Sequence, residues 1–277
     1  MLISGQKTFT NPVSSQENFQ LKMGTHIIEK TDTYKYLGII FDDKLNWNHQ
    51  IDTICSKLST VCGVISKVRH YLDRKSLMMI YNSLFDSRLR YGILGWGTAT
   101  ENLVSKVKVL QNKVVRYITF SEFGTRSTTM YSALDIVPFN DQLFLQRSIV
   151  MHSLYYKNIP FALSFYCKLP QHDRSTRYKS NRNFILPVAK TVRSQTSMKF
   201  AGPKAWTSVP NDIKEIAYRK PFSKRLKKFI LEKQREDNEN LPENSYLKEK
   251  HKKKNKLKTD YVEMFASDSD ESDFVGF

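Results

Sequence analysis

The stretch from residue 48 to residue 72, NHQIDTICSKLSTVCGVISKVRHYL, decides the fold class of the chain. Its apolar side chains recur with a period of about 3.6 residues, whereas Lys57, Lys67 and Arg69 fall largely outside the apolar stripe. The apolar members are Ile51, Ile54, Cys55, Leu58, Cys62, Ile65 and Leu72. This pattern predicts an amphipathic helix of roughly four or five turns, one face of which packs against other elements.

The same period continues on the C-terminal side of this stretch. Apolar stripes cover residues 77–85 and 103–118, and short connections between three consecutive amphipathic helices imply a bundle. Pro138, followed by Asn140-Asp141, marks the start of a fourth helix. Further helices are expected at residues 159–166, around Trp206, after Pro210 and at residues 222–231.

On the N-terminal side the sequence has the character of β-structure. Residues 34–41 form a dense run of β-branched and aromatic residues that ends at Asp42-Asp43, and Gly24 marks a turn within residues 19–28. These pieces make a hairpin or a short meander, which is too small to be stable alone. The first residues resemble a strand whose partners lie upstream, so the chain is expected to be truncated.

The charge balance favours polyanions as partners. The chain has 277 residues, with 44 Lys or Arg against 27 Asp or Glu and a formal net charge of +17. Hydrophobic residues make up 40% of it, which is enough for one or two packed cores and excludes a chain that is disordered throughout. No apolar run approaches the roughly 18 to 20 residues that span a bilayer, and no membrane partner is expected.

Beyond Glu232 the sequence becomes low in complexity. Residues 248–258 contain seven lysines, and residues 267–273 alternate Ser with Asp or Glu. Such segments bury too little apolar surface to offset chain entropy, so a disordered tail is expected. The lysine run is either a nuclear-import signal or only a solvated tail.

The cysteines indicate no covalent or metal framework. Cys55, Cys62 and Cys167 form no CxxC pair and have no closely spaced histidine partners. The pattern excludes a disulfide framework and a zinc module, and it favours a reducing, intracellular location in the nucleus or the cytoplasm. No metal site and no cofactor are expected in this chain.

Asp42 and Asp43 follow Phe41 at the end of a strand, as carboxylates do in the metal-binding hairpin of a polymerase. Phosphoryl transfer through two metals needs carboxylates that converge from at least two strands. The other acidic residues nearby, Glu17, Glu29 and Asp32, lie in loop-like stretches. The pair is therefore expected to serve a turn or a helix N-cap.

Several motifs in a fixed order carry a family resemblance. Residues 36–42 read YLGIIFD, and Leu45, Trp47 and His49 follow at the expected places. Further matches are Leu84 with Tyr91-Gly92 and Trp96, residues 110–118, and residues 202–213, where Thr207 replaces the usual Asn. Over roughly residues 1–231 the chain resembles jockey-like reverse transcriptases of retrotransposons without long terminal repeats (non-LTR), at the point where the palm leads into the thumb.

The resemblance implies a mainly α fold with a small N-terminal β remnant (α+β). It assigns a palm remnant to residues 1–47 and a thumb-like helical bundle to 48–120. The apolar pattern and the composition add a C-terminal helical region at 121–235, with a basic loop or hairpin at 172–204, and a disordered basic-then-acidic tail at 236–277. In this family the catalytic carboxylates lie upstream of the matching segment. The chain is therefore expected to be a fragment of an RNA-directed DNA polymerase that is inactive alone, with Mg²⁺ bound only by the full-length enzyme.

The resemblance also implies that Tyr36 and Gly38 lie near the primer end. A glycine in a strand allows another backbone to approach closely, although Gly38 as a bulge in a packed strand is an equal alternative. Basic helix faces are a second group, expected to contact the phosphates of a template–primer duplex unless they are only solvated faces. Their members are Lys57, Lys67, Arg69, Arg74, Lys75 and Arg88.

The basic loop provides a third group. Its cations hold phosphates while its aromatic rings stack on unpaired bases, or else the rings only anchor the loop to a core. The cations are Arg174, Arg177, Lys179, Arg182, Arg193 and Lys199, and the aromatic residues are Tyr178, Phe184 and Phe200. Trp47, Trp96 and Trp206 are expected to be core anchors.

The expected partners are RNA or an RNA–DNA hybrid, together with the upstream reverse transcriptase fingers and palm of the full-length protein. A second hypothesis, from another class, is a domesticated nucleic-acid-binding or adaptor protein without polymerase activity. Both hypotheses draw on the same excess of positive charge.

Overall fold

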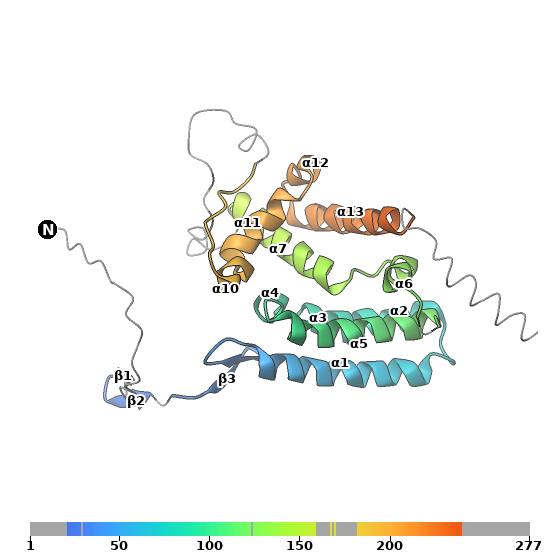
Figure 1. Ribbon diagram of the computed structural model, residues 1–277, viewed down its shortest axis with the longest axis horizontal. Coiled ribbons are helices and arrows are strands. Elements are labelled where there is room, and N and C mark those ends of the chain that lie inside the picture. Colours follow the sequence, from blue (N-terminus) through green and yellow to red (C-terminus); the bar gives the residue numbers. More distant parts are fainter. Residues whose placement is uncertain are drawn as a thin grey trace, which may run out of the picture. The chain divides into compact units, whose positions relative to one another are not determined.

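The computed structural model describes residues 21–28, 30–122, 124–158, 167, 169 and 182–239 (Figure 1). The chain divides into two compact units after Val114, unit 1 (residues 1–114) and unit 2 (residues 115–277). The fold is mainly α with a small N-terminal β part, which confirms the predicted class. None of the described helices is both long enough and apolar enough to cross a membrane.

The β part of unit 1 consists of two separate antiparallel hairpins. β1 (Leu21–Met23) pairs with β2 (His26–Ile28), and β3 (Thr33–Tyr36) pairs with β4 (Ile39–Asp42). The run at residues 34–41 is thus a hairpin and not one strand, because the chain reverses at Leu37 and Gly38. Both turn residues have positive φ, 48° at Leu37 and 79° at Gly38, as a type I′ turn requires. Gly38 is therefore a turn residue rather than a bulge.

The helices of unit 1 follow the predicted apolar stripes. They are α1 (Asn48–Val68), α2 (Arg74–Ile80), the π-helical turn η1 (Tyr81–Asp86), α3 (Ser87–Arg90), α4 (Ile93–Trp96) and α5 (Glu101–Thr119), whose last residues belong to unit 2. Along α1, Ile51, Leu58 and Ile65 are fully buried. The predicted break at Asp73 is the N-cap of α2, where the carboxylate accepts a hydrogen bond from the Ser76 amide (3.3 Å).

The second predicted helix is continuous but changes its geometry along its length. In η1, between α2 and α3, the turns are wider than in an α-helix, so each contains more residues. Tyr81 in η1 is buried, and its hydroxyl accepts a hydrogen bond from the side-chain amide of Gln111 on α5 (3.2 Å). Burial raises the pKa of Tyr81. The neutral phenol therefore ties η1 to α5.

Unit 2 is built around one tryptophan. Its helices are α6 (Ser127–Leu134), α7 (Phe139–Tyr155), α10 (Val192–Thr196), α11 (Met198–Thr207), α12 (Asn211–Lys214) and α13 (Arg219–Glu239). Trp206 is fully buried, with the rings of Tyr155 and Phe222 at 6.0 Å and 5.8 Å between centroids. Gly202 allows α11 to approach α7, because a Cβ there would lie only 2.7 Å from the Met151 sulfur.

The structure differs from the predicted basic loop at residues 172–204. Residues 182–191 are irregular, but α10 and most of α11 occupy the rest of the described part. Thr191 caps α10 by accepting a hydrogen bond from the Ser194 amide (3.2 Å), and Ala201 and Trp206 are buried in the core. Capping and burial outweigh the local excess of charge. Residues 172–181, like the helix predicted at residues 159–166, lie outside the described residues.

The last helix is longer than predicted, and α6 was not predicted. Helix α13 continues to Glu239 instead of ending at residue 231, because α6 holds its final turns. Arg235 forms an ion pair with Asp135 at the end of α6 (2.6 Å), and the Asn238 amide donates to the Ser132 hydroxyl (3.0 Å). The predicted tail beyond residue 239 lies outside the described residues.

The predicted core anchors are confirmed at two of three positions. Trp96 and Trp206 are fully buried, whereas Trp47 is only half-buried. All three cysteines are free thiols, and burial raises the pKa of Cys62 to about 11.

Candidate nucleic-acid interface

The turn between β3 and β4 is tied to the helices of unit 1. The hydroxyl of Tyr91, just after α3, donates a hydrogen bond to the Leu37 carbonyl oxygen. On the other side of the turn, the Ile40 amide donates to the side-chain oxygen of Gln50 in the first turn of α1 (2.8 Å). Gln50 is almost completely buried. The two bonds fix the turn over the space between α1 and α3.

The Asp42 carboxylate fixes the connection from β4 to α1. One of its oxygens accepts a hydrogen bond from the Asn46 amide (2.7 Å) and the other from the Trp47 amide (2.8 Å). The Trp47 ring lies 5.5 Å from the Phe41 ring and closely approaches Gly95, whose hypothetical Cβ would be 3.3 Å away. These bonds give Asp42 the turn role that the sequence predicts. Within the described ranges, no group of three His, Cys, Asp or Glu residues is placed to hold a metal ion.

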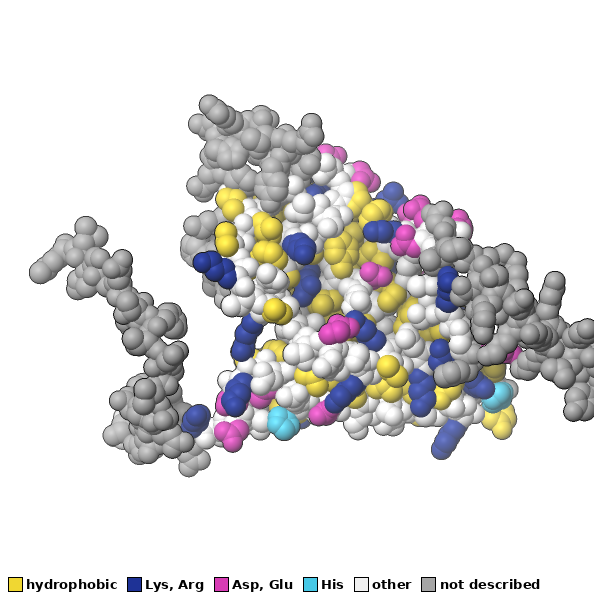
Figure 2. All heavy atoms as spheres, in the orientation of Figure 1, with side chains coloured by type: hydrophobic (Ala, Val, Ile, Leu, Met, Phe, Trp, Pro, Cys, Tyr) yellow, Lys and Arg dark blue, Asp and Glu magenta, His cyan; other side chains and the backbone are white. Residues whose placement is uncertain are grey.

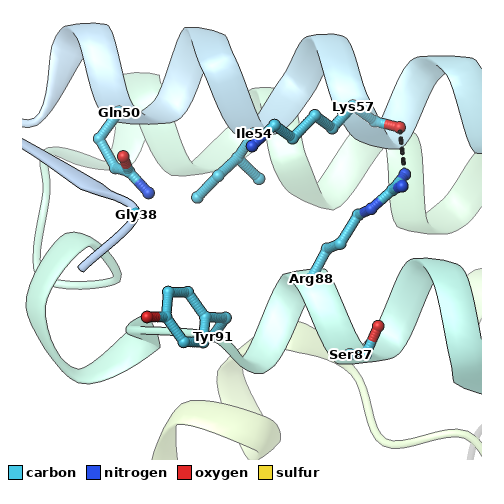
Figure 3. Close-up of a pocket in the computed structure, with 7 residues that line it drawn as sticks. All are labelled: Gly38, Gln50, Ile54, Lys57, Ser87, Arg88 and Tyr91. Carbon is cyan, nitrogen blue, oxygen red and sulfur yellow. Dashed lines mark hydrogen bonds between the residues drawn. The ribbon is translucent and has the colours of Figure 1, made fainter. Parts of the chain in front are cut away.

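A cavity of about 240 Å³ lies under the turn, and it is here called the turn cavity (Figure 3). It is lined by Gly38, Gln50, Ile54, Lys57, Ser87, Arg88 and Tyr91. Figure 3 shows the Lys57 side chain running back along α1 towards Ile54, while the Arg88 guanidinium reaches across from α3. Arg88 donates a hydrogen bond to the Lys57 carbonyl oxygen (3.3 Å). Two cations and no carboxylate line this cavity, so it is suited to an anionic group.

The structure brings together three of the predicted site residues in unit 1 and separates the others. Gly38, Lys57 and Arg88 line the turn cavity, and Tyr36 is exposed in the adjacent strand β3. Lys67 lies ten residues beyond Lys57, about 15 Å further along the axis of α1. The remaining cations, Arg69, Arg74 and Lys75, lie at the connection from α1 to α2. Figure 2 shows Lys and Arg side chains spaced along the helices of unit 1 rather than gathered at one point.

In unit 2 the predicted basic segment has a mainly structural role in its described part. The Arg182 carbonyl oxygen accepts a hydrogen bond from the Trp206 ring nitrogen (2.8 Å). The Arg182 guanidinium lies 3.7 Å from the Glu215 carboxylate. Phe184 is buried with its ring edge-on to Trp206 (6.1 Å), so it anchors the chain and is not available to stack on a base. Arg193 lies in α10, Lys199 is exposed on α11, and Phe200 on α11 is half-buried. The predicted residues Arg174, Arg177, Tyr178 and Lys179 lie outside the described residues.

Sequence reasoning missed the residues that complete the turn cavity. Gln50, Ser87 and Tyr91 were not predicted as site residues, and Arg88 was grouped only with the general basic faces. A signal for Gln50 was present: a glutamine on the apolar stripe of an amphipathic helix needs a hydrogen-bond partner inside the protein. No such signal exists for Ser87, whose position becomes evident only in three dimensions.

Comparison with known proteins agrees with the resemblance. The chain is 25% identical over 119 residues to a probable RNA-directed DNA polymerase from the transposon X-element of Drosophila melanogaster, covering 42% of this chain and 13% of that protein. It is 28% identical over 139 residues to the RNA-directed DNA polymerase from the mobile element jockey of the same species (49% of this chain, 15% of that protein). A probable polymerase from transposon BS is 26% identical over 151 residues, 51% of this chain and 16% of the relative.

The matching segment therefore spans less than a fifth of the length of each of these relatives. No protein-family model matches the chain, and no solved structure matches it. The ordered motifs and these relatives together show that the chain is related to the RNA-directed DNA polymerases of jockey-like non-LTR retrotransposons.

Proposed function

We propose that the chain holds template–primer nucleic acid for a retrotransposon RNA-directed DNA polymerase, with the turn cavity as a contact to the phosphate backbone. The observation that carries the proposal is the Leu37-Gly38 turn, fixed by Tyr91 and Gln50 beside two cations. The relatives are RNA-directed DNA polymerases, which supports a nucleic-acid partner for this chain, and we take that partner to be RNA or an RNA–DNA hybrid.

The conformation of the turn supports this role. Leu37 has a positive φ of 48°, which is unfavourable for a residue with a branched side chain, and 71% of the residue is exposed. Core packing therefore does not explain the strain, and strained residues that persist concentrate at binding sites. Gly38 presents bare backbone next to Lys57 and Arg88, so a phosphate group can approach the turn closely.

The proposal assigns nucleic-acid binding to this chain and catalysis to another part of the full-length enzyme. Asp42, the carboxylate at the end of β4, uses both oxygens to hold backbone amides. In the proposal the catalytic carboxylates and their Mg²⁺ belong to the upstream part of the full-length enzyme. The purified chain is then expected to bind template–primer without extending it. Metal-dependent nucleotide incorporation by the chain alone would contradict this part.

Binding is tested with a labelled RNA–DNA hybrid by fluorescence anisotropy at several salt concentrations. The double variant Lys57→Gln/Arg88→Gln is expected to bind more weakly, and the slope of log K against log salt is expected to decrease by about 2, because two phosphate contacts are lost. The matched control is Lys67→Gln/Lys75→Gln, which removes the same charge in the last turn of α1 and the first turn of α2. An equal loss in both double variants would reject the turn cavity as a distinct contact.

A further inference from the structure

Helix α13 in unit 2 carries a stripe of four lysines, here called the α13 stripe. Its members are Lys220, Lys224, Lys227 and Lys228, all of them exposed. Their spacing of i, i+4, i+7 and i+8 places them on one face of the helix. The opposite face is buried in the core of unit 2 through Phe222, Leu226 and Ile230. The stripe is therefore a fixed surface on a packed helix.

The charge pattern of α13 opposes the stability of the helix itself. Acidic residues near the start of a helix and basic residues near its end are favourable for the helix dipole, but α13 has no acid in its first turn and no base in its last. Lys220 and Lys224, and Lys224 and Lys228, are also like-charged neighbours one turn apart, an unfavourable arrangement. Folding therefore does not explain the stripe. Charges that are placed unfavourably for the helix itself are expected at functional surfaces.

Three of the four lysines in the stripe have no ion-pair partner among the described residues. Lys228 lies 3.4 Å from Glu232 and is still 67% exposed. In the part of the chain that the structure describes, no carboxylate forms an ion pair with Lys220, Lys224 or Lys227. The cations are thus available to an external polyanion.

We propose that the α13 stripe is a second phosphate-binding surface for nucleic acid, in addition to the turn cavity. The choice of ligand rests on the proposed function. The stripe extends about 12 Å along the helix axis, at 1.5 Å per residue, which matches roughly three to four nucleotides at about 3.4 Å each. Contacts of lysine to phosphate carry no base preference, so the surface holds nucleic acid without reading its sequence. A lipid surface fits less well, because the apolar face that would enter it is already buried.

The test uses the full chain and a labelled RNA–DNA hybrid. Substitution of all four lysines by Gln is expected to decrease the slope of log K against log salt by about 3 to 4. Substitution of all four by Arg is expected to retain the slope. The control is Lys250→Gln/Lys252→Gln/Lys253→Gln/Lys254→Gln, which changes the net charge equally outside α13. A decrease of the same size in the control would overturn the proposal.

The same series separates this proposal from the function of the turn cavity. If only the Lys57→Gln/Arg88→Gln variant loses affinity, the α13 proposal fails and the proposed function stands. If only the stripe variant loses affinity, the turn cavity is rejected and the stripe is retained. Binding of the wild-type chain to anionic lipid vesicles, with no protection by nucleic acid, would overturn the choice of ligand.

A second measurement covers a stripe variant that fails to fold. In the wild-type chain, nucleic acid is expected to protect Lys220, Lys224 and Lys227 from acetylation by an amine-reactive ester, as read by mass spectrometry. Lys44, an exposed lysine in unit 1 outside the turn cavity, serves as the internal reference. Equal acetylation of the stripe with and without nucleic acid would overturn the proposal.

Discussion

Replacement of Lys214 by Met should change how the stability of the protein depends on pH. Lys214 on α12 is 1% exposed, its ammonium group donates to the Asn183 side-chain oxygen (3.0 Å), and it lies 5.7 Å from the centre of the Trp206 ring. Burial lowers the pKa of this lysine from 10.5 to about 8. Desolvation penalises the charged form, so the folded protein releases this proton more readily than the unfolded chain does.

The size of the effect follows from the pKa difference. At about 1.4 kcal/mol per pKa unit, the lowering corresponds to about 3 kcal/mol of destabilisation at pH 7, where Lys214 is protonated in both states. Between pH 8 and 10.5 the unfolded chain keeps a proton that the folded protein has lost, so this group makes the free energy of unfolding rise with pH. Met removes the penalty but leaves the Asn183 oxygen without this donor, which costs about 1–3 kcal/mol.

Urea denaturation followed by circular dichroism measures the difference. At pH 7 Lys214→Met should be as stable as the wild type or up to about 2 kcal/mol more stable. At pH 10.5 the variant should be less stable than the wild type, so the difference in the free energy of unfolding between the two proteins should change by about 2 to 3 kcal/mol between the two pH values. The contributions of other titrating groups cancel in this difference. The exposed lysine variant Lys220→Met should show no such swing. A stability difference between Lys214→Met and wild type that stays constant with pH would refute the reasoning.

Three further predictions concern packing and backbone geometry. Gly92→Ala should lower the free energy of unfolding by about 1–3 kcal/mol in urea denaturation, because the φ of Gly92 is +65° and the new Cβ would lie 2.5 Å from the Ile39 side chain. The control is Gly63→Ala in the middle of α1, where no atom outside the local helix backbone lies within 4 Å of the new Cβ, and this variant should be neutral or stabilising. Asp42→Ala should cost about 1–2 kcal/mol in the same assay through the loss of two amide partners, and no change would mean that water replaces the carboxylate. Ile230→Ala should lower stability by about 2–5 kcal/mol by opening a cavity under α13, and a loss below about 1 kcal/mol would show that the core refills it.

The helices of unit 1 could be predicted from sequence because their burial is periodic. α1 begins at the predicted residue, and the apolar residues of its stripe supply most of its buried face. The reversal at Leu37 was missed, because leucine is a poor turn residue and only Gly38 signals a turn inside a run of good strand formers. The turn cavity could not be predicted, since it depends on contacts between Gly38, Gln50 and Tyr91, which are far apart in sequence.

In unit 2 composition gave a misleading prediction. The many cations within residues 172–204 indicated a basic loop or hairpin. In the described part of this segment, however, Phe184 and Ala201 are buried, and Trp206 just after it is buried in the same core. The helix α6 was missed because its sequence contains no clear helix signal. It is short, and its contact with Arg235 and Asn238 joins segments about a hundred residues apart.

The wide turn η1 has a consequence for how this region tolerates insertions and deletions. Each residue of an α-helix advances the direction of the side chains by about 100°, so a residue gained or lost upstream rotates every later side chain by that angle. Because η1 precedes α3, the number of residues in Tyr81–Asp86 determines the direction in which the Arg88 and Tyr91 side chains point. A one-codon deletion there would leave the chain helical and its hydrophobic content intact, yet it would aim both side chains away from the strand turn.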